Sequence, residues 1–352
     1  MNRRFNVLGQ TLALSAAMMT ALPMPSAFAW GPPGIPRDQR NAALIYWKAW
    51  AMATDDPMRA DIDWTAIGSN LDPAKMPESF TRAAADVATR EAAIDVLLEA
   101  TTLPRCDFEL AYEQGFALVL PHIGKMRGGA RLLRIDARRL LMENKPQRAA
   151  GHIAAMLRMS RQLRDDGVLI SSLVGMAIST IAMDEGTVLI ESGKLSAADA
   201  APIREALKSA LETDAFGVRA CVRGEGEILR RWIADKFTGK TAGADLLKAM
   251  DFGVTSTSGD ELKAAKEAVS KMDDAALNAD VALLLKGYRD IDAAWDAADA
   301  ENRIGEISER SSKGAYGQLA VIAFPSFSRA RANVTTNAQK LKDFSARLER
   351  LK

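Results

Sequence analysis

Histidine and cysteine are both scarce in this 352-residue chain, which contains two of each. His122 and His152 stand in no HExxH or similar pattern, and a zinc site usually needs three or four His, Cys or acidic ligands. No Gly-x-Ser-x-Gly turn precedes a helical segment, and the glycine patterns of phosphate and dinucleotide loops are missing. The sequence therefore predicts no metal, no cofactor and no recognisable catalytic motif.

Signals for β-strands are also weak. Aromatic residues make up 6% of the chain, and alternating β-branched residues never extend beyond a few positions. Nonpolar residues instead recur three or four positions apart over most of the sequence, which predicts an all-α protein of stacked antiparallel helical hairpins, either α-solenoid-like or a multi-helix bundle. With 46 basic against 45 acidic residues, the net charge does not favour nucleic acid as a partner.

The first 29 residues have the three parts of a secretory signal peptide. Arg3 and Arg4 precede a nonpolar run from Val7 to Leu22, and Ala27-Phe28-Ala29 forms a cleavage motif. That run is 16 residues long, whereas a helix needs about 20 to span a membrane. We expect cleavage after Ala29 and export to the periplasm or cell envelope; the alternative is a buried N-terminal helix.

The remaining chain divides into a helical-hairpin domain over residues 30–236, connecting loops rich in Gly, Ser and Thr over 237–260, and a C-terminal helical segment over 261–352 that packs on the main body. The nonpolar spacing predicts helices over residues 37–53, 78–100, 118–144, 146–166, 169–190, 197–213 and 216–236. Segment 169–190 is long enough to span a membrane, but Asp184 and Glu185 interrupt it, which favours a buried helix.

Two helix junctions have a similar pattern. Residues 143–150 and 191–198 each end one helix and begin another that has alanine at its inner positions. The pattern resembles tetratricopeptide-like hairpins. The spacing is not the 34 residues of that repeat and its signature aromatics are missing, so the likeness concerns architecture alone.

The last helix carries a heptad pattern. One heptad position is occupied by Phe327, Val334, Leu341 and Leu348, and the other by Ala330, Asn337, Phe344 and Leu351. This pattern favours a terminal helix that docks on its own chain. A coiled coil is one alternative, and peripheral membrane attachment through the basic, amphipathic helix is another.

Cys106 and Cys221 are the only two cysteines, and an even number in an exported chain favours a disulfide. A bridge between them would close a loop worth about 4–5 kcal/mol in the chain-entropy model. The alternative is two separately buried thiols.

Four arginines lie along the predicted helix 118–144 at spacings of four, three and four residues: Arg127, Arg131, Arg134 and Arg138. With His122 near the start of the helix, this row is a candidate anion-binding face, because guanidinium groups match carboxylate and phosphate. The alternative is pairing with acidic residues of another helix.

The adjacent acids Asp184 and Glu185 lie in nonpolar surroundings, which would raise a carboxyl pKa. Because neighbours in sequence cannot share one helical face, at most one of them can point inward. That residue is a candidate catalytic carboxylate or one half of a salt bridge.

Several short segments together resemble a known group. They are Asn41-Ala42-Ala43 with Tyr46-Trp47, Cys106-Asp107-Phe108, Leu120-Pro121-His122-Ile123 with the arginine row, and the run from Leu169 to Gly175. The chain is similar, over about residues 37–235, to a group of exported helical bacterial proteins with no assigned activity. The resemblance implies a helical fold and export and leaves the chemistry open.

The leading hypothesis from sequence is a non-catalytic envelope protein whose helical hairpins present a groove or face to a protein or peptide partner. One alternative is an all-helical hydrolase or lyase that uses a carboxylate with His122 and the arginine row. The other is a peripheral membrane-associated protein that attaches through its terminal helix.

Overall fold

A computed structural model describes residues 39–53, 62–250 and 259–351. The chain divides into two units, Met1–Arg40 and Asn41–Lys352, and nearly all described residues belong to the second. The predicted signal peptide and its cleavage site lie outside the described residues. The described part of the chain is helical and has no β-strand beyond an isolated bridge between Asn41 and Arg105, which confirms the all-α prediction.

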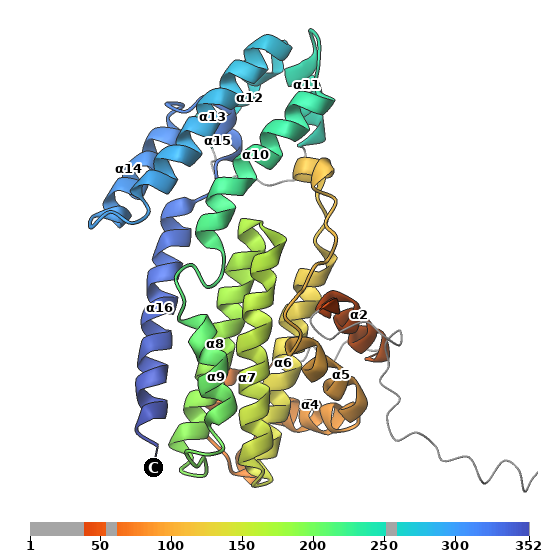
Figure 1. Cartoon of the computed structure of the whole chain (residues 1–352). Coiled ribbons are helices and arrows are strands. Elements are labelled where there is room, and N and C mark those ends of the chain that lie inside the picture. Colours follow the sequence, from red (N-terminus) through yellow and green to blue (C-terminus); the bar gives the residue numbers. More distant parts are fainter. Residues whose placement is uncertain (1–38, 54–61, 251–258, 352) are drawn as a thin grey trace, which may run out of the picture. The chain divides into compact units, whose positions relative to one another are not determined.

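Three long antiparallel helices form the centre of the second unit (Figure 1). They are α6 (Pro121–Met142), α7 (Pro146–Gln162) and α8 (Leu169–Glu191), and all three keep close to their predicted bounds. A proline begins both α6 and α7, where its missing N–H interrupts no helical hydrogen bond. Asn144 reverses the chain between them with a left-handed φ of 60°, a conformation that asparagine tolerates. The first predicted hairpin junction is therefore present.

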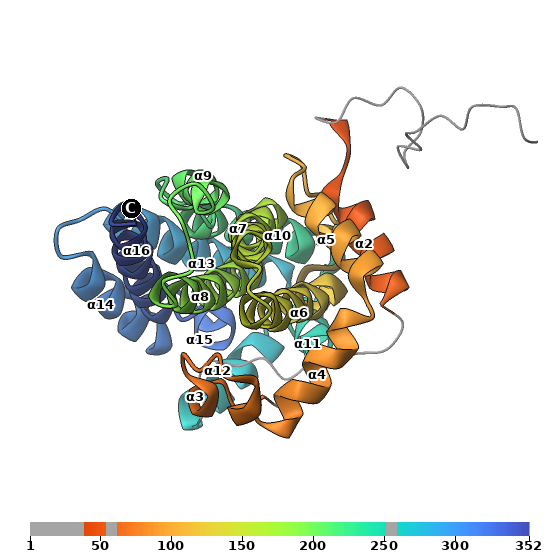
Figure 2. The ribbon, with the colours of Figure 1, turned by 90° about the horizontal axis from the view of Figure 1, so that it is seen from below.

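Helix α8 is nonpolar around most of its surface because other helices enclose it. The helices α6, α7, α10 (Val218–Lys236) and α16 (Phe327–Glu349) pack against it, and Figure 2 shows α6, α7, α8 and α16 nearly end-on. Among the described residues, α8 is the one helix long and nonpolar enough to cross a membrane, but most of that stretch is buried. This agrees with the prediction of a covered core helix.

The second predicted junction differs in detail. Helix α9 (Ala201–Ala210), which packs on α7, begins four residues after the predicted start at 197. The side chain of Ser196 bonds to both the backbone N–H and the carboxylate of Asp199, which holds residues 196–199 in a turn. Pro202 then sits in the first turn of the helix.

Shorter helices cover the other side of α6 and α7. They are α2 (Ala42–Met52), α3 (Trp64–Ile67), α4 (Glu78–Ala88) and α5 (Glu91–Thr101), with the 3-10 turn η3 (Pro73–Lys75). The predicted single helix over 78–100 is wrong, because it breaks at Thr89–Arg90. Helix α4 packs on α6, whereas α5 packs on α2 and α7, so the two halves bury their nonpolar faces against different partners.

Helix α2 begins at Ala42 rather than at residue 37. The side chain of Asn41 caps it by accepting a hydrogen bond from the Ala43 N–H at 3.1 Å. The same side chain bonds in both directions to the backbone of Asp107. Asn41 therefore joins the start of α2 to the segment that follows α5. Trp50 is buried on this helix, whereas Trp47 is 38% exposed.

The C-terminal part adds α10, α11 (Ala242–Ala249), α12 (Asp260–Ser270), α13 (Asp274–Ala294), α14 (Ala300–Ser312) and α15 (Gln318–Ala323). Helix α11 lies within residues 237–260, for which the sequence predicts connecting loops. Gly243 suggested a flexible segment, but it lies in the helix and donates to the Met272 carbonyl at 3.0 Å. A Cβ there would fall 1.8 Å from the Val269 carbonyl oxygen, so the glycine permits close helix packing.

The terminal helix α16 docks on its own chain, against α8, α14 and α9. Most nonpolar residues of the heptad pattern are buried, and the polar member, Asn337, donates hydrogen bonds to the Met176 carbonyl and to Ser179 Oγ on α8. On the same helix, Phe344 packs against Gly186 of α8. The nonpolar stripe that would serve a coiled coil or a membrane surface is therefore already covered.

The predicted disulfide between Cys106 and Cys221 is absent, and both residues are buried free thiols. Cys221 lies on α10, and its Sγ is 3.3 Å from Ser172 Oγ on α8. Cys106 lies in the segment after α5. Each thiol is fully buried in the core, so helix packing, without a crosslink, joins these segments.

Candidate functional site

A cavity of about 550 Å³ opens between the first turn of α8, helices α10 and α13, and the junction of α15 with α16. The 3-10 segment η4 (Tyr112–Ala117) and the residues after it close the remaining side. The lining comprises Gly115, Phe116, Leu118, Leu120, Val168, Leu169, Ile170, Leu173, Glu225, Ile228, Leu229, Tyr288, Ile322, Ala323, Phe324, Pro325, Ser326, Arg329, Ala330 and Asn333. The volume falls within the ~300–1,000 Å³ of typical small-molecule sites.

Aromatic contacts hold the walls of the cavity. Gly115 has a φ of 54°, and a Cβ there would lie 2.1 Å from the ring of Trp232, so only glycine lets η4 rest on this α10 side chain. Trp232 in turn meets Phe116 edge-on, with 5.7 Å between ring centroids. Across the cavity, Phe324 meets Tyr288 edge-on at 5.3 Å. The cavity is therefore bounded by fixed rings.

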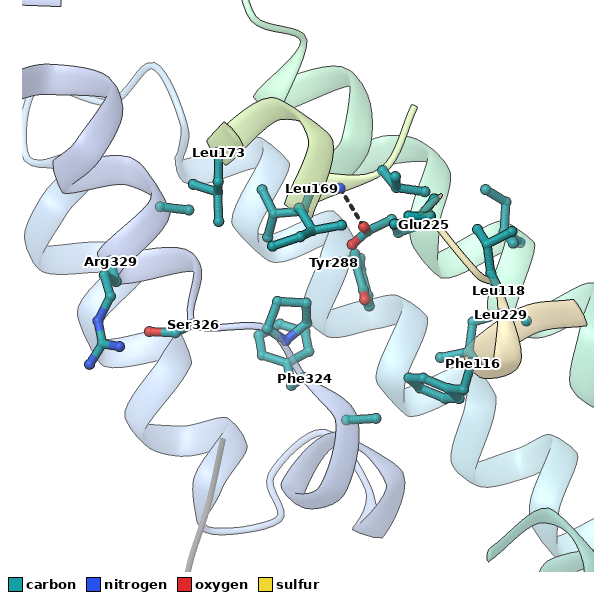
Figure 3. A pocket seen from close by; sticks show the side chains of 18 of the residues that line it. Phe116, Leu118, Leu169, Leu173, Glu225, Leu229, Tyr288, Phe324, Ser326 and Arg329 are labelled. Atoms are coloured by element: carbon teal, nitrogen blue, oxygen red, sulfur yellow. Dashed lines mark hydrogen bonds between the residues drawn. The ribbon is translucent and has the colours of Figure 1, made fainter. Parts of the chain in front are cut away.

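Glu225 is the only acidic residue in this lining. One of its carboxylate oxygens accepts a 2.6 Å hydrogen bond from the backbone N–H of Leu169, the first residue of α8 (Figure 3). Burial among nonpolar groups raises the pKa of Glu225 to about 7, and the hydrogen bond from Leu169 opposes that rise. Near neutral pH the cavity wall thus holds a carboxyl group close to its titration point.

Among the other polar side chains of the lining, Tyr288 lies on α13, and the remaining three gather at the start of α16. Ser326, Arg329 and Asn333 lie three and four residues apart, so they share one side of that helix, and all three are exposed. Figure 3 shows Arg329 and Ser326 on one side of the cavity and Leu118, Leu229 and Phe116 on the other, with Phe324 between them. The site is a nonpolar cavity with a basic group at one edge.

The arginine row predicted as an anion-binding face does not line this cavity. Arg138 is fully buried, and its Nε donates to Glu185 of α8 at 2.6 Å while Arg134 contacts the same carboxylate at 3.3 Å. Arg138 also donates to the carbonyls of Gly68 and Asn70, and the Arg134 guanidinium lies 3.7 Å from the Trp64 ring centroid. These two arginines fasten α3 and α8 to α6.

The rest of the row has other surroundings. Arg127 and Arg131 are exposed on α6. Of the two acids, Glu185 points inward and Asp184 is exposed, as helical geometry requires of neighbours. The inward carboxylate is half of a buried ion pair, the alternative that the sequence left open.

Both histidines form buried pairs with aspartates. His122 Nε2 lies 2.7 Å from an oxygen of Asp166, and His152 Nε2 lies 2.8 Å from an oxygen of Asp136. The His122 ring also stacks on Phe108 at 4.0 Å. Neither histidine lines the cavity, so the structure does not bring His122 and the arginine row together as one site. In the described part of the chain, no group of three His, Cys, Asp or Glu residues is placed to hold a metal ion.

Sequence reasoning missed the residues that line the cavity. One signal was present on α10, where Val222, Glu225 and Leu229 are spaced three and four apart, so Glu225 is an acid at an inward position. No pattern could identify Arg329, because the cavity edge forms only when α16 docks.

The chain matches no protein-family model, no curated protein and no solved structure. The resemblance to exported helical bacterial proteins therefore stays a prediction.

Proposed function

We propose that this is a non-catalytic binding protein whose cavity takes up the hydrophobic part of a partner. The observation that carries the proposal is the cavity itself: about 550 Å³ of space with a lining that is mostly aliphatic and aromatic. Nonpolar groups placed in such a site leave water, at roughly 25 cal/mol for each Å² covered. Concave, nonpolar sites with a few polar groups are the usual form of ligand pockets.

The lining favours binding over catalysis. Glu225 is the only residue there with a pKa near 7. Burial, together with the charge of Glu225, holds the pKa of the neighbouring Tyr288 well above its usual 10, and the lining contains no histidine, cysteine or lysine as a partner in acid–base or nucleophilic chemistry. The hydrolase or lyase considered from sequence would use His122 with the arginine row. In the structure His122 pairs with Asp166, and two arginines of the row, Arg134 and Arg138, pair with Glu185.

The surroundings of the opening suit a hydrophobic partner. Phe116 and Ile170, which line the cavity, are 37% and 50% exposed, and the neighbouring Val119 is 67% exposed. Exposed nonpolar residues grouped beside a cavity are typical of interaction sites. The sequence favoured a protein or peptide partner, and a peptide would insert only a few side chains, because the cavity has the size of a small-molecule site. The location of the protein in the cell envelope remains our expectation from the predicted signal peptide.

The test is binding of an uncharged hydrophobic fluorophore, N-phenyl-1-naphthylamine. We expect saturable fluorescence enhancement with the wild-type protein and loss of most of it in Leu173→Trp, where the larger side chain occupies the part of the cavity beside α8. The matched control is Leu283→Trp, because Leu283 is 45% exposed on α13 and does not line the cavity. Equal enhancement by both variants, with unchanged circular dichroism, would reject the proposal.

A further inference from the structure

The charges at the cavity have a definite arrangement. Arg329 is the only basic residue of the lining, it is exposed, and among the described residues it forms no ion pair. Ser326 and Asn333, its neighbours on the same side of α16, add a hydroxyl and an amide. The hydroxyl, amide and guanidinium groups all donate hydrogen bonds. The N–H donors of a guanidinium have a geometry that matches a carboxylate or phosphate.

The opposite part of the lining has a different character. Phe116, Leu118 and Leu229 line that side, and Figure 3 shows them across the cavity from Arg329. Glu225 also lies away from Arg329 in that view, and its carboxyl group is already bonded to the Leu169 N–H. A negatively charged group is therefore accommodated at the Arg329 edge and finds no basic partner at the Glu225 wall, whereas a hydrocarbon fits the space between.

We propose that the cavity binds a single-chain amphiphile with an anionic head, namely a long-chain carboxylate. The hydrocarbon chain lies against Phe324 and extends toward Phe116, and the carboxylate pairs with the Arg329 guanidinium at the cavity edge. This inference rests on the proposed function and adds the chemical class of the ligand. It distinguishes the ligand from an uncharged lipid, from a cationic amphiphile held by Glu225 and from a hydrophobic peptide.

The experiment compares ligands that share one hydrocarbon chain. Decanoate, decan-1-ol and decyltrimethylammonium compete at low ionic strength with N-phenyl-1-naphthylamine, as does a nonpolar hexapeptide with blocked ends. We expect the wild-type protein to bind decanoate about two- to five-fold more tightly than the alcohol, which is the upper part of the range of an exposed ion pair. The preference should shrink as salt is added, because exposed charges are screened.

Two matched variants test the position of the head group. Arg329→Gln should bind decanoate and decan-1-ol equally, and Arg329→Lys should keep part of the preference. Arg350→Gln removes the same charge from the exposed far end of α16 and should behave as the wild type. Because Arg329 is exposed, these changes should leave the fold intact.

Each contrary outcome identifies the step that failed. If the wild type binds the alcohol as tightly as the carboxylate, or binds the ammonium or the blocked peptide best, the inference is wrong. It is equally wrong if Arg329→Gln keeps the full preference for decanoate. In those cases the proposed function would still be supported if the wild type binds the uncharged dye and Leu173→Trp loses most of that binding. If the wild type does not bind the dye, both the inference and the proposed function are wrong.

Discussion

The backbone N–H of Leu169 donates a 2.6 Å hydrogen bond to the carboxyl group of Glu225, so the first residue of α8 is joined to the middle of α10 at the cavity wall. The carboxyl group thereby caps the positive end of a long helix. It does so in surroundings nonpolar enough to hold its pKa near 7, well above the ordinary 4.5.

The burial of Glu225 predicts a pH-dependent stability. Between pH 4.5 and about 7, Glu225 ionises in the unfolded chain but stays protonated in the folded one, so the wild type loses stability as pH rises through that window. Glu225→Gln cannot ionise and still offers Leu169 a carbonyl oxygen. Denaturant unfolding should show equal free energies for both proteins at pH 4, and the variant more stable by roughly 1–3 kcal/mol at pH 8.

The control for this prediction is Glu227, whose pKa is shifted in the opposite direction. Hydrogen bonds from Arg230 and Arg231 lower the pKa of Glu227 to about 2. Glu227→Gln should therefore lose stability relative to the wild type as pH rises from about 2 to 4.5, and the difference should stay constant above that window. Parallel pH profiles for the two variants would contradict the assignment of Glu225.

The buried contact between Arg138 and Glu185 should be costly to break. Arg138→Met leaves Glu185 with the longer contact to Arg134 alone, and it leaves the carbonyls of Gly68 and Asn70 without their donor. Removing one partner of a buried ion pair typically costs about 3–5 kcal/mol.

The matched control is Arg127→Met on the same helix, where the side chain is exposed and the expected change is within about 0.5 kcal/mol. Free energies from urea unfolding distinguish the two. Similar values for both variants would show that Arg138 has no such role.

The two cysteines should behave as shielded thiols. Burial raises the pKa of Cys106 well above its usual range and that of Cys221 to about 12, so the reactive thiolate is suppressed at both sites. A thiol-reactive chromogenic reagent should label neither in the folded protein and two thiols per chain after unfolding without reductant. A yield of zero after unfolding would reveal a disulfide.

Gly243 should not tolerate a methyl group, although glycine generally weakens a helix. Gly243→Ala places a Cβ against the Val269 carbonyl and should lower the thermal midpoint. In Gly151→Ala, on α7, the Cβ meets no atom within 4 Å, and the better helix former should raise stability by about 0.5–1 kcal/mol. Opposite shifts of the two midpoints are the expected result, and a rise in both would refute the packing role of Gly243.

Features of the fold that depend on local sequence could be predicted, whereas those that depend on tertiary packing could not. The central helices follow their nonpolar spacing closely, because proline begins α6 and α7 and a full nonpolar surface marks α8. The break at Arg90 has no such local signal. The break depends on the packing of α4 and α5 against different helices. No pattern within residues 78–100 indicates those partners.

The candidate site shows the same division. The arginine row could be recognised from its spacing in the sequence. Which of its members form ion pairs depended on Glu185, which lies on α8 and faces α6 only after the helices pack together. The cavity needs η4, α8, α10, α13 and α16 together, so residues from five separate parts of the chain had to be placed at once.

Binding in the cavity is tested most directly by nuclear Overhauser contacts between a bound ligand and the residues of its lining. With methyl-labelled protein and N-phenyl-1-naphthylamine, the ring protons should give cross-peaks to the methyl groups of Leu118, Leu173 and Leu229, which line the cavity. Cross-peaks confined to the exposed Leu44 and Leu283, or none at all under saturating ligand, would show that the ligand does not bind in the cavity.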